Sequence, residues 1–160
     1  MMHFFYKIIF FLYAGLILFS LLFFSRDSEE LKWKQKQWLL AGESSFNNMD
    51  NWTTYNINKK EQWISTNDDP ILISPLLNDM GAKQTLIEIE IDSTSSQVQI
   101  FWRSNDEENF SEQRSKTFNS RDPIKFAADG DVKQIRIDPG NVPNAVFKIK
   151  EVKIKKYYNN

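Results

Sequence analysis

The chain contains no cysteine, and its single histidine is His3. The lack of cysteine excludes disulfides, thiolate metal sites, lipid attachment through cysteine and cysteine nucleophiles. With its one histidine so close to the amino terminus, a folded domain further along would lack the central residue of a Ser-His-Asp triad, a His-rich zinc site or a histidine general base. We therefore expect no metal ion, no cofactor and no catalytic residue.

The chain also lacks a strong charge of one sign. From residue 43 onward it has 15 Lys and Arg against 18 Asp and Glu, a net charge of −3. Nucleic-acid binding depends on a one-sided positive field, so we expect no nucleic acid among its partners. The length of 160 residues is accounted for by one membrane segment and one domain.

A long apolar run is present near the amino terminus. No residue from Ile8 to Phe24 is charged, and 13 of these 17 residues are Ile, Leu or Phe. On the insertion scale they contribute about −4 to −8 kcal/mol, which favours a helix across a lipid bilayer. The alternative is a cleaved signal peptide, but "LLFFSRDS" has large Phe residues where a cleavage site needs small ones. We predict an uncleaved transmembrane anchor over residues 1–25.

Residues 26–42 follow this run and resemble a short juxtamembrane helix or linker. Ser28 precedes two acidic residues as a helix cap would, and Leu31, Trp38 and Leu39 share one helical face, with Gly42 as the stop. Two interpretations of the tryptophans stay open. They anchor the chain at the level of the lipid headgroups, or they dock on a membrane partner.

Residues 43–160 show the two-residue period of β-strands. In "TLIEIEID", Ile87, Ile89 and Ile91 fall on one face and the two glutamates on the other. "SQVQIFWR" repeats the pattern. Further candidate strands are "WTTYNI", "QWIS", "ILIS", "SKTFN", "PIKFA", "VKQIRID" and "NAVFKIKEVKIKK", separated by segments rich in Asn, Asp, Gly and Pro.

Eight or nine short strands in succession predict an all-β fold. A single open sheet of this length would leave one apolar face in water, so we expect a two-layer jelly-roll β-sandwich over residues 43–160.

The last strand has an irregular pattern. Phe147 and Ile149 are odd-numbered inward candidates, whereas Val152 and Ile154 are even-numbered, so the inward phase slips near Lys150 and Glu151. A β-bulge at that point would return both pairs to the core.

Two stretches, "VQIFWRSNDEENFSEQRSKTF" and "VKQIRIDPGNVPNAVFKIKEVKI", carry a resemblance to a known family. They resemble the carbohydrate-binding-module-like (galactose-binding-like) β-sandwich domains that accompany bacterial cell-envelope glycosyltransferases. The similarity covers about residues 84–155. The matching residues are Trp102, Phe110, Ser111, Glu112, Ser115, Arg136, Ile137, Asp138 and Pro139.

The resemblance implies an extracytoplasmic domain on a single-pass anchor in the bacterial cytoplasmic (inner) membrane. The positive charges that flank the apolar run favour the opposite orientation, but long domains translocate largely regardless of such charges. The chain departs from the family at Asn144, where such domains often have Gly. Asn tolerates a positive φ better than most residues, so the corner can survive.

Trp102, Arg103, Phe110 and Glu112 are candidates for a sugar site, because aromatic faces suit pyranose rings and charged side chains bond hydroxyls. Trp102 shares the phase of the core residues in its strand, which favours packing over binding and makes Arg103 the better surface candidate. Trp52, Tyr55 and Trp63 pose the same choice between packing and a binding platform.

Arg136 and Asp138 share one face of a strand, where they form a local ion pair or contact a ligand. Asp122, Asp129 and Asp131 lie near "ADGD", and without the spacing of an oxygen-rich calcium loop we expect them to be solvated turn acids.

The lysine-rich ending "KIKEVKIKK" reads either as the polar face of a protected edge strand or as a contact for anionic lipid or glycan. Taken together, these features predict a non-catalytic, membrane-anchored accessory module that binds carbohydrate or a glycosyltransferase complex. The alternative is a structural or assembly subunit that packs on a polytopic membrane protein without binding sugar. A glycan hydrolase is a distant third, because sequence spacing cannot show a carboxylate pair.

Overall fold

The computed structural model describes residues 38–59, 62–104 and 109–159. The predicted anchor over 1–25 and the predicted helix up to residue 37 lie outside these ranges and stay predictions. Within the described ranges, no helix has the length and apolar character needed to cross a membrane. A compact unit runs from Leu39 to Tyr158.

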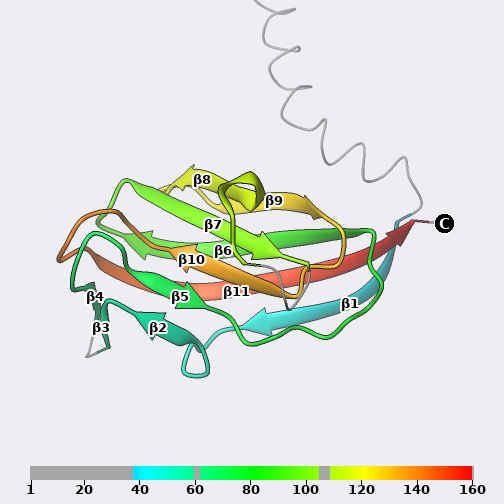
Figure 1. Ribbon diagram of the computed structural model, residues 1–160, viewed down its shortest axis with the longest axis horizontal. Helices are drawn as coiled ribbons and strands as arrows, with labels where there is room; N and C mark the ends of the chain where they lie inside the picture. The colour runs from blue at the N-terminus through cyan, green and yellow to red at the C-terminus, as the bar shows by residue number, and fades with distance from the viewer. Residues whose placement is uncertain (1–37, 60–61, 105–108, 160) are drawn as a thin grey trace, which may run out of the picture. The chain divides into compact units, whose positions relative to one another are not determined.

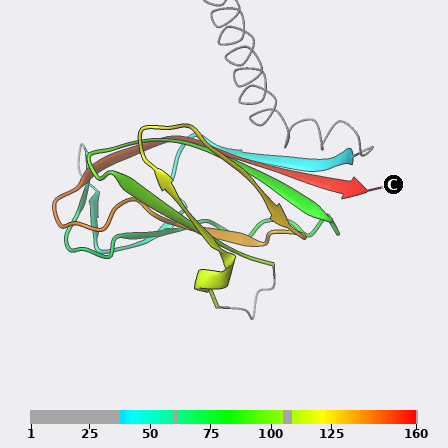
Figure 2. The same ribbon diagram turned by 90° about the horizontal axis from the view of Figure 1, so that it is seen from above.

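Two antiparallel sheets stack face to face in this unit (Figures 1 and 2). The first sheet is built from β1 (Trp38–Phe46), β3 (Ile57–Lys59), β4 (Trp63–Ser65), β6 (Gln84–Ser93), β9 (Ile124–Asp129) and β11 (Val146–Asn159). The second is built from β2 (Thr53–Tyr55), β5 (Ile71–Ile73), β7 (Gln97–Arg103), β8 (Ser115–Asn119) and β10 (Gln134–Asp138). A short 3-10 helix, η1 (Glu112–Arg114), precedes β8. The predicted β-sandwich is confirmed.

The strand order explains how the two sheets are tied together. The second sheet runs β2-β5-β10-β7-β8, and the first runs β3-β4-β11-β6-β9, with β1 paired to β11. Most consecutive strands therefore belong to different sheets, as is typical of a jelly roll. Asn56 shows how such a crossing is made. It takes a φ of 58° between β2 and β3, a conformation that Asn accepts more readily than most residues.

Alternating apolar residues fill the space between the sheets. Ile87, Ile89 and Ile91 of β6 are buried, and so are Val98 and Ile100 of β7. Burying an aliphatic side chain of this size contributes about 1.5–3 kcal/mol, so the alternation fixes which face of each strand turns inward. Every segment that the sequence predicts to be a strand contains a strand in the structure.

The irregularity predicted in the last strand is present. The pairing of β11 with β6 shifts between Ile149 and Glu151, so that Lys150 is an extra residue. Phe147 and Ile149 before the shift are buried, and so are Val152 and Ile154 after it. The predicted β-bulge is confirmed, and it gives both apolar pairs to one core.

The region around residues 38–42 differs from the prediction. The expected juxtamembrane helix is wrong there, because β1 begins at Trp38 and runs across the predicted domain start at residue 43. Helical spacing of Leu31, Trp38 and Leu39 suggested a helix. From Trp38 onward, pairing with the long β11 instead extends the chain, and Leu39 and Leu40 are then half exposed.

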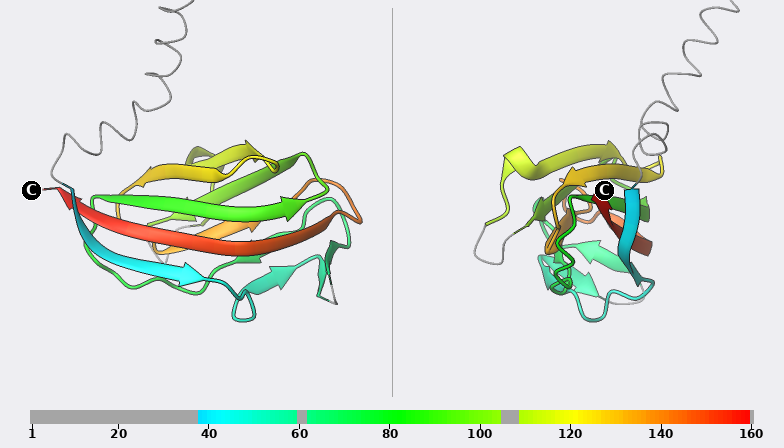
Figure 3. Two further views of the ribbon diagram at one scale, coloured as in Figure 1. Left: turned by 180° about the vertical axis from the view of Figure 1, so that it is seen from behind. Right: turned by 90° about the vertical axis from the view of Figure 1, so that its right-hand side faces the viewer.

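β11 lies inside its sheet and not at its edge (Figure 3, left). The interpretation of "KIKEVKIKK" as an edge strand is therefore wrong. Four of its five lysines form ion pairs: Lys150 with Glu90 and Asp92 at 3.0 Å each, Lys153 with Glu151 at 2.7 Å, Lys155 with Glu88 at 3.3 Å, and Lys156 with Asp131. The run makes a ladder of ion pairs on the outer face of the first sheet.

Candidate functional site

The outer face of the second sheet brings most of the candidate residues together. In β7, Gln99, Phe101 and Arg103 alternate with the core residues and so point outward. In β10 the same holds for Gln134, Arg136 and Asp138. The antiparallel register sets these residues opposite one another in three rows: Arg103 with Gln134, Phe101 with Arg136, and Gln99 with Asp138. We call these six residues the Arg136 face; it lies on the side of the molecule nearest the viewer in Figure 1.

Arg136 is the centre of this face. Its guanidinium donates two hydrogen bonds to Asp138, from Nε at 2.7 Å and from Nη2 at 2.6 Å. Nη2 also lies 3.3 Å from Asp69. The guanidinium carbon sits 4.8 Å from the centre of the Phe101 ring, which explains why an outward-facing phenylalanine is only 5% exposed. Arg136 is thus held in one position by a carboxylate and a ring.

The pKa values of this pair reflect both burial and charge. Burial lowers the pKa of Arg136, but the hydrogen bond and the charge of Asp138 outweigh it, so the pKa is raised. Burial raises the pKa of Asp138, and the nearby carboxylates of Asp69 and Glu112 add to this effect against the opposing influence of Arg136. The face therefore contains a partly buried carboxylate whose pKa is raised by burial although Arg136 opposes the shift.

A second cluster borders the first. Gln99 Nε2 donates to Glu112 Oε2 at 2.8 Å and to the hydroxyl of Ser115 at 3.1 Å. The same hydroxyl donates to the Glu112 carbonyl at 3.0 Å, which holds η1 against the start of β8. The turn of η1 is what brings Glu112 beside β7.

Arg103 completes the face. Its Nε donates to Gln134 Oε1 at 2.9 Å, and its guanidinium lies 5.5 Å from the ring of Phe110. Gln134 in turn donates to the carbonyl of Ser74 at 2.6 Å. Planar amide and guanidinium groups are thus fixed side by side, with edges turned to the outside of the sheet.

The structure places five of the six predicted site residues on or beside one surface and the sixth, Trp102, elsewhere. Arg103, Phe110, Glu112, Arg136 and Asp138 belong to the Arg136 face or border it. Trp102 does not, because its side chain points into the core, is 9% exposed and packs 5.3 Å from the ring of Phe126. The structure thus places Trp102 in the core, where the periodicity of its strand favoured packing.

Sequence reasoning missed three members of the face, Gln99, Phe101 and Gln134. Their outward phase was visible, but the signal that joins them to Arg136 is the pairing of β7 with β10, about 35 residues apart in the chain. Tyr55 of β2 adds an exposed ring on the same outer surface of the sheet, at 53% exposure.

Asp131 also differs from expectation. Its carboxylate is largely buried, accepts hydrogen bonds from the backbone of Met80 at 2.6 Å and of Ala82 at 3.2 Å, and forms an ion pair with the buried Lys156. It is therefore a structural residue and not a solvated turn acid. Across the residues that the structure describes, no group of three or more His, Asp or Glu side chains could hold a metal ion.

Comparisons with known proteins give distant structural likenesses alone. No family model matches the chain, and no curated protein matches it. Among solved structures, a family 29 carbohydrate-binding module from Piromyces equi has 11% identity and a TM-score of 0.47, over 75% of this chain and 90% of its own. A family 35 carbohydrate-binding module from Clostridium thermocellum has 11% identity and a TM-score of 0.47, over 71% and 98%.

A third similar structure is not a carbohydrate-binding module. A chain from the disulfide-linked pili of Bacillus endospore appendages has 8% identity and a TM-score of 0.42, over 77% of this chain and 90% of its own. At this level of similarity the ligands of these proteins are not transferable to the chain. The resemblance to glycosyltransferase-associated domains stays a prediction.

Proposed function

We propose that this protein is a non-catalytic glycan-binding module and that the Arg136 face is where the saccharide binds. The observation that supports this most directly is the set of three cross-strand rows of amide, guanidinium and carboxylate groups with Phe101 among them, and with the ring of Phe110 beside Arg103. The six residues of the rows come from two strands, and their positions are fixed by sheet pairing.

The chemistry of the face suits a polyhydroxylated ligand. Vicinal hydroxyls need donors and acceptors that lie side by side, and planar amides, guanidinium groups and carboxylates provide such pairs. The bonds among Arg136, Asp138, Gln99 and Glu112 already restrict these side chains, so binding costs less rotamer entropy. The carboxylates are bonded to neighbours, and this arrangement favours recognition over hydrolysis.

The proposed setting is an accessory role in a bacterial envelope glycan pathway. The apolar run Ile8–Phe24 supports an anchor in the cytoplasmic membrane. The resemblance of residues 84–155 to domains that accompany glycosyltransferases supports an extracytoplasmic position beside such an enzyme. Glycan bound to the Arg136 face would then be held near the membrane.

A second candidate function is assembly on a membrane protein. It is favoured by exposed apolar side chains on the two faces of β1, Leu39 at 51% and Leu40 at 55%. Exposed apolar surface is a feature of sites that contact a protein or a membrane. In this case the sandwich would act as a spacer or docking body without a saccharide.

An array of envelope and plant oligosaccharides, probed with the full-length chain in mild detergent, separates the two functions. We expect binding to at least one saccharide, followed by a loss of affinity of roughly tenfold in Arg103→Ala, which removes a charge-assisted hydrogen bond, and a smaller loss in Gln99→Ala, which removes a neutral one. Lys125→Ala on the opposite sheet is the matched control and should bind normally. If the chain binds no saccharide on the array, the proposed glycan-binding function is refuted and the assembly function is the one that remains.

A further inference from the structure

β1 lies at a border of the first sheet. β6 occupies one side of β11 through the pairing of Gln84–Ser93, and β4 and β1 share the other side. β4 pairs with β11 at Val146 and Phe147, whereas the Ser45 hydroxyl of β1 donates to the Glu151 carboxylate at 3.2 Å, further along β11. Among the described strands, β1 pairs with β11 alone (Figure 3, left). Its other edge therefore has main-chain N–H and C=O groups that none of these strands binds.

The other border strands are protected against pairing. Within residues 38–59, 62–104 and 109–159, β2, β3, β8 and β9 also border a sheet. β2 and β3 have three residues each, and β8 and β9 contain the exposed Lys116 and Lys125. Short edges and lysines are common means of preventing unwanted strand pairing. β1 has nine residues, no lysine and no proline, and its single charge is Glu43. Its edge is therefore long and unprotected.

Exposed leucines lie on both faces of β1. The Ser45 side chain turns to the outer face, where it meets Glu151, and the Phe46 ring turns inward, 5.7 Å from the ring of Trp52. By alternation Leu39 belongs to the outer face and Leu40 to the inner one, and they are 51% and 55% exposed. A partner packed on one face would cover one leucine. A strand paired with the edge of β1 would flank both.

The fold holds β1 in place before any partner arrives. Pairing with β11 extends it, and the segment between β5 and β6 supports it from the inward side. There a Cβ atom at Gly42 would lie only 3.0 Å from the terminal carbon of Met80, so the glycine lets the two backbones approach. A partner strand would meet a preformed edge, which lowers the entropy lost on pairing.

The sequence of β1 is suited to pairing with a second copy of itself. In an antiparallel pair centred on Gly42, all nine residues find an opposite residue. Trp38 then faces Phe46 of the other copy, which is a favourable aromatic pair, and Glu43 faces Ala41, so no like charges are directly opposed. A partner must also offer an unprotected edge, and in the described part of this chain that edge is β1 itself.

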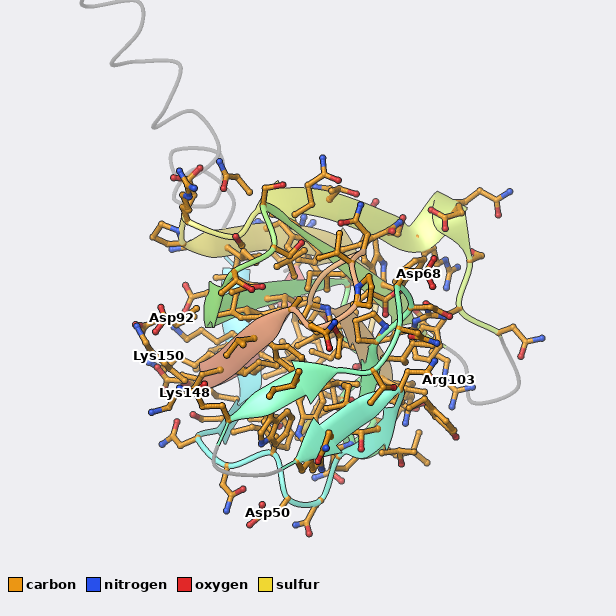
Figure 4. All side chains as sticks on the ribbon, turned by 90° about the vertical axis from the view of Figure 1, so that its left-hand side faces the viewer. Asp50, Asp68, Asp92, Arg103, Lys148 and Lys150 are labelled. Carbon is orange, nitrogen blue, oxygen red and sulfur yellow. The ribbon has the colours of Figure 1, made fainter. Side chains whose placement is uncertain are left out.

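We propose that two copies of the chain pair through their β1 edges, antiparallel and about a twofold axis at Gly42, so that the two first sheets become one continuous sheet. The proposal goes beyond the proposed glycan binding and does not depend on it. Figure 4 shows Lys148 and Lys150 of the first sheet on one side of the sandwich and Arg103 of the second sheet on the other. A dimer joined through the first sheet therefore leaves the Arg136 face of each copy open.

Disulfide formation between introduced cysteines tests the pairing and its register. The chain has no cysteine of its own, so the introduced thiols are the only ones. Ala41→Cys and Glu43→Cys chains, full-length and in detergent, would be mixed and oxidised mildly. In the proposed pair these two positions are directly opposite, at a Cα separation of about 4.5–5.5 Å that a disulfide can span. In either variant alone the two thiols lie on a diagonal, about 7–8 Å apart, which is too far. We expect at least fivefold more disulfide-linked dimer from the mixture than from either variant alone.

Two controls accompany this measurement. Ala127→Cys mixed with Asp129→Cys repeats the design on β9, whose edge has Lys125, and should give no linked dimer. Leu40→Lys, added to both β1 variants, puts a lysine on the pairing edge and should reduce the linked dimer at least tenfold. Val142→Lys replaces another exposed apolar residue, at 45% exposure and outside β1, and should leave the yield unchanged.

The outcomes separate clearly. Equal yields from the mixture and from the single variants, or a mixture that Leu40→Lys does not affect, would overturn the β1 pair. No linked dimer in any sample would also overturn it, and the exposed leucines would then favour the assembly function instead. The comparison of the mixture with the single variants needs no Leu40→Lys chain, so the test holds even if that variant folds poorly.

Discussion

At the scale of single residues, the same side-chain type has different roles according to its neighbours. Asp131 is buried against Lys156, Asp138 is paired with Arg136 on an outer face, and Asp50 closes an exposed turn. The role of Asp131 does not follow from local sequence, because its partner Lys156 lies in another strand, whereas the pairing of Asp138 with Arg136 was one of the two roles expected from the sequence. The outward phase of Arg136 and Asp138 was readable from the alternation in β10, whereas the ring of Phe101 beneath Arg136 was not.

Glu88 offers a test of the ion-pair ladder. Burial raises the pKa of Glu88, but hydrogen bonds and charges from Lys125 and Lys155 outweigh it, so the pKa lies below its usual 4.5. A lowered pKa in the folded state means that the contribution to stability is present above the unfolded value and disappears as the pH falls through the folded one. Glu88→Gln should therefore reduce the free energy of unfolding by about 0.5–1 kcal/mol at pH 7 and by almost nothing at pH 2.

Urea denaturation at the two pH values measures this difference. Glu90→Gln is the control, since its side chain is more exposed, at 62% against 24%, and should have a smaller effect. An equal loss for Glu88→Gln at pH 7 and pH 2 would show that packing, and not charge, accounts for its contribution.

At the scale of elements, the positions of most strands could be predicted from the sequence, whereas the strand that each one pairs with could not. The two-residue alternation in Ile87, Ile89 and Ile91 is local information, and it placed β6 correctly. β1 was missed because Trp38, Leu39 and Leu40 lack alternation, and their apolar spacing imitates a helix. β11 was assigned to an edge because its lysines resemble edge protection, whereas its acidic partners lie about 60 residues earlier in β6.

The bulge at Lys150 is the element whose removal has the clearest consequence. Deleting Lys150 leaves Phe147, Ile149, Val152 and Ile154 at every second position of a regular strand, so all four still turn inward and the pairing with β6 keeps its register. The deletion should therefore remove only the ion pairs of Lys150 with Glu90 and Asp92 and cost about 0–1 kcal/mol. Thermal or urea denaturation of the deletion variant measures this change.

Lys150→Ala is the control for the deletion. It keeps the residue count and removes only the contacts with Glu90 and Asp92, so it should cost about 0–1 kcal/mol. The deletion variant should be about as stable as Lys150→Ala; a further loss of about 3 kcal/mol or more would contradict this prediction, because it would mean that one apolar pair has turned outward.

At the scale of the whole molecule, two sheets present two different outer surfaces. One carries the Arg136 face, made of amides, guanidinium groups and rings. The other carries the ladder of ion pairs. The sandwich itself could be predicted from strand number and turn residues. The candidate site could be predicted only in part. Five of the six candidate residues lie on or beside one surface, but the pairing of distant strands, which brings them together, could not be read from the sequence.

The chain's proposed role needs only recognition from these surfaces, since its one histidine is His3 and it has no cysteine. An anchor at Ile8–Phe24 would then keep whatever the sandwich binds close to a membrane. The β-sandwich is the established part of this account, and binding by the Arg136 face is its central claim.

Mapping of amide chemical shifts tests that claim most directly. The ¹⁵N-labelled full-length chain in detergent would be titrated with the saccharide that gives the strongest signal on the array. The account predicts a cluster of shifted amides in β7 and β10, centred on Phe101 and Arg136. Shifts confined to other parts of the sandwich, or no shift with any saccharide, would contradict it.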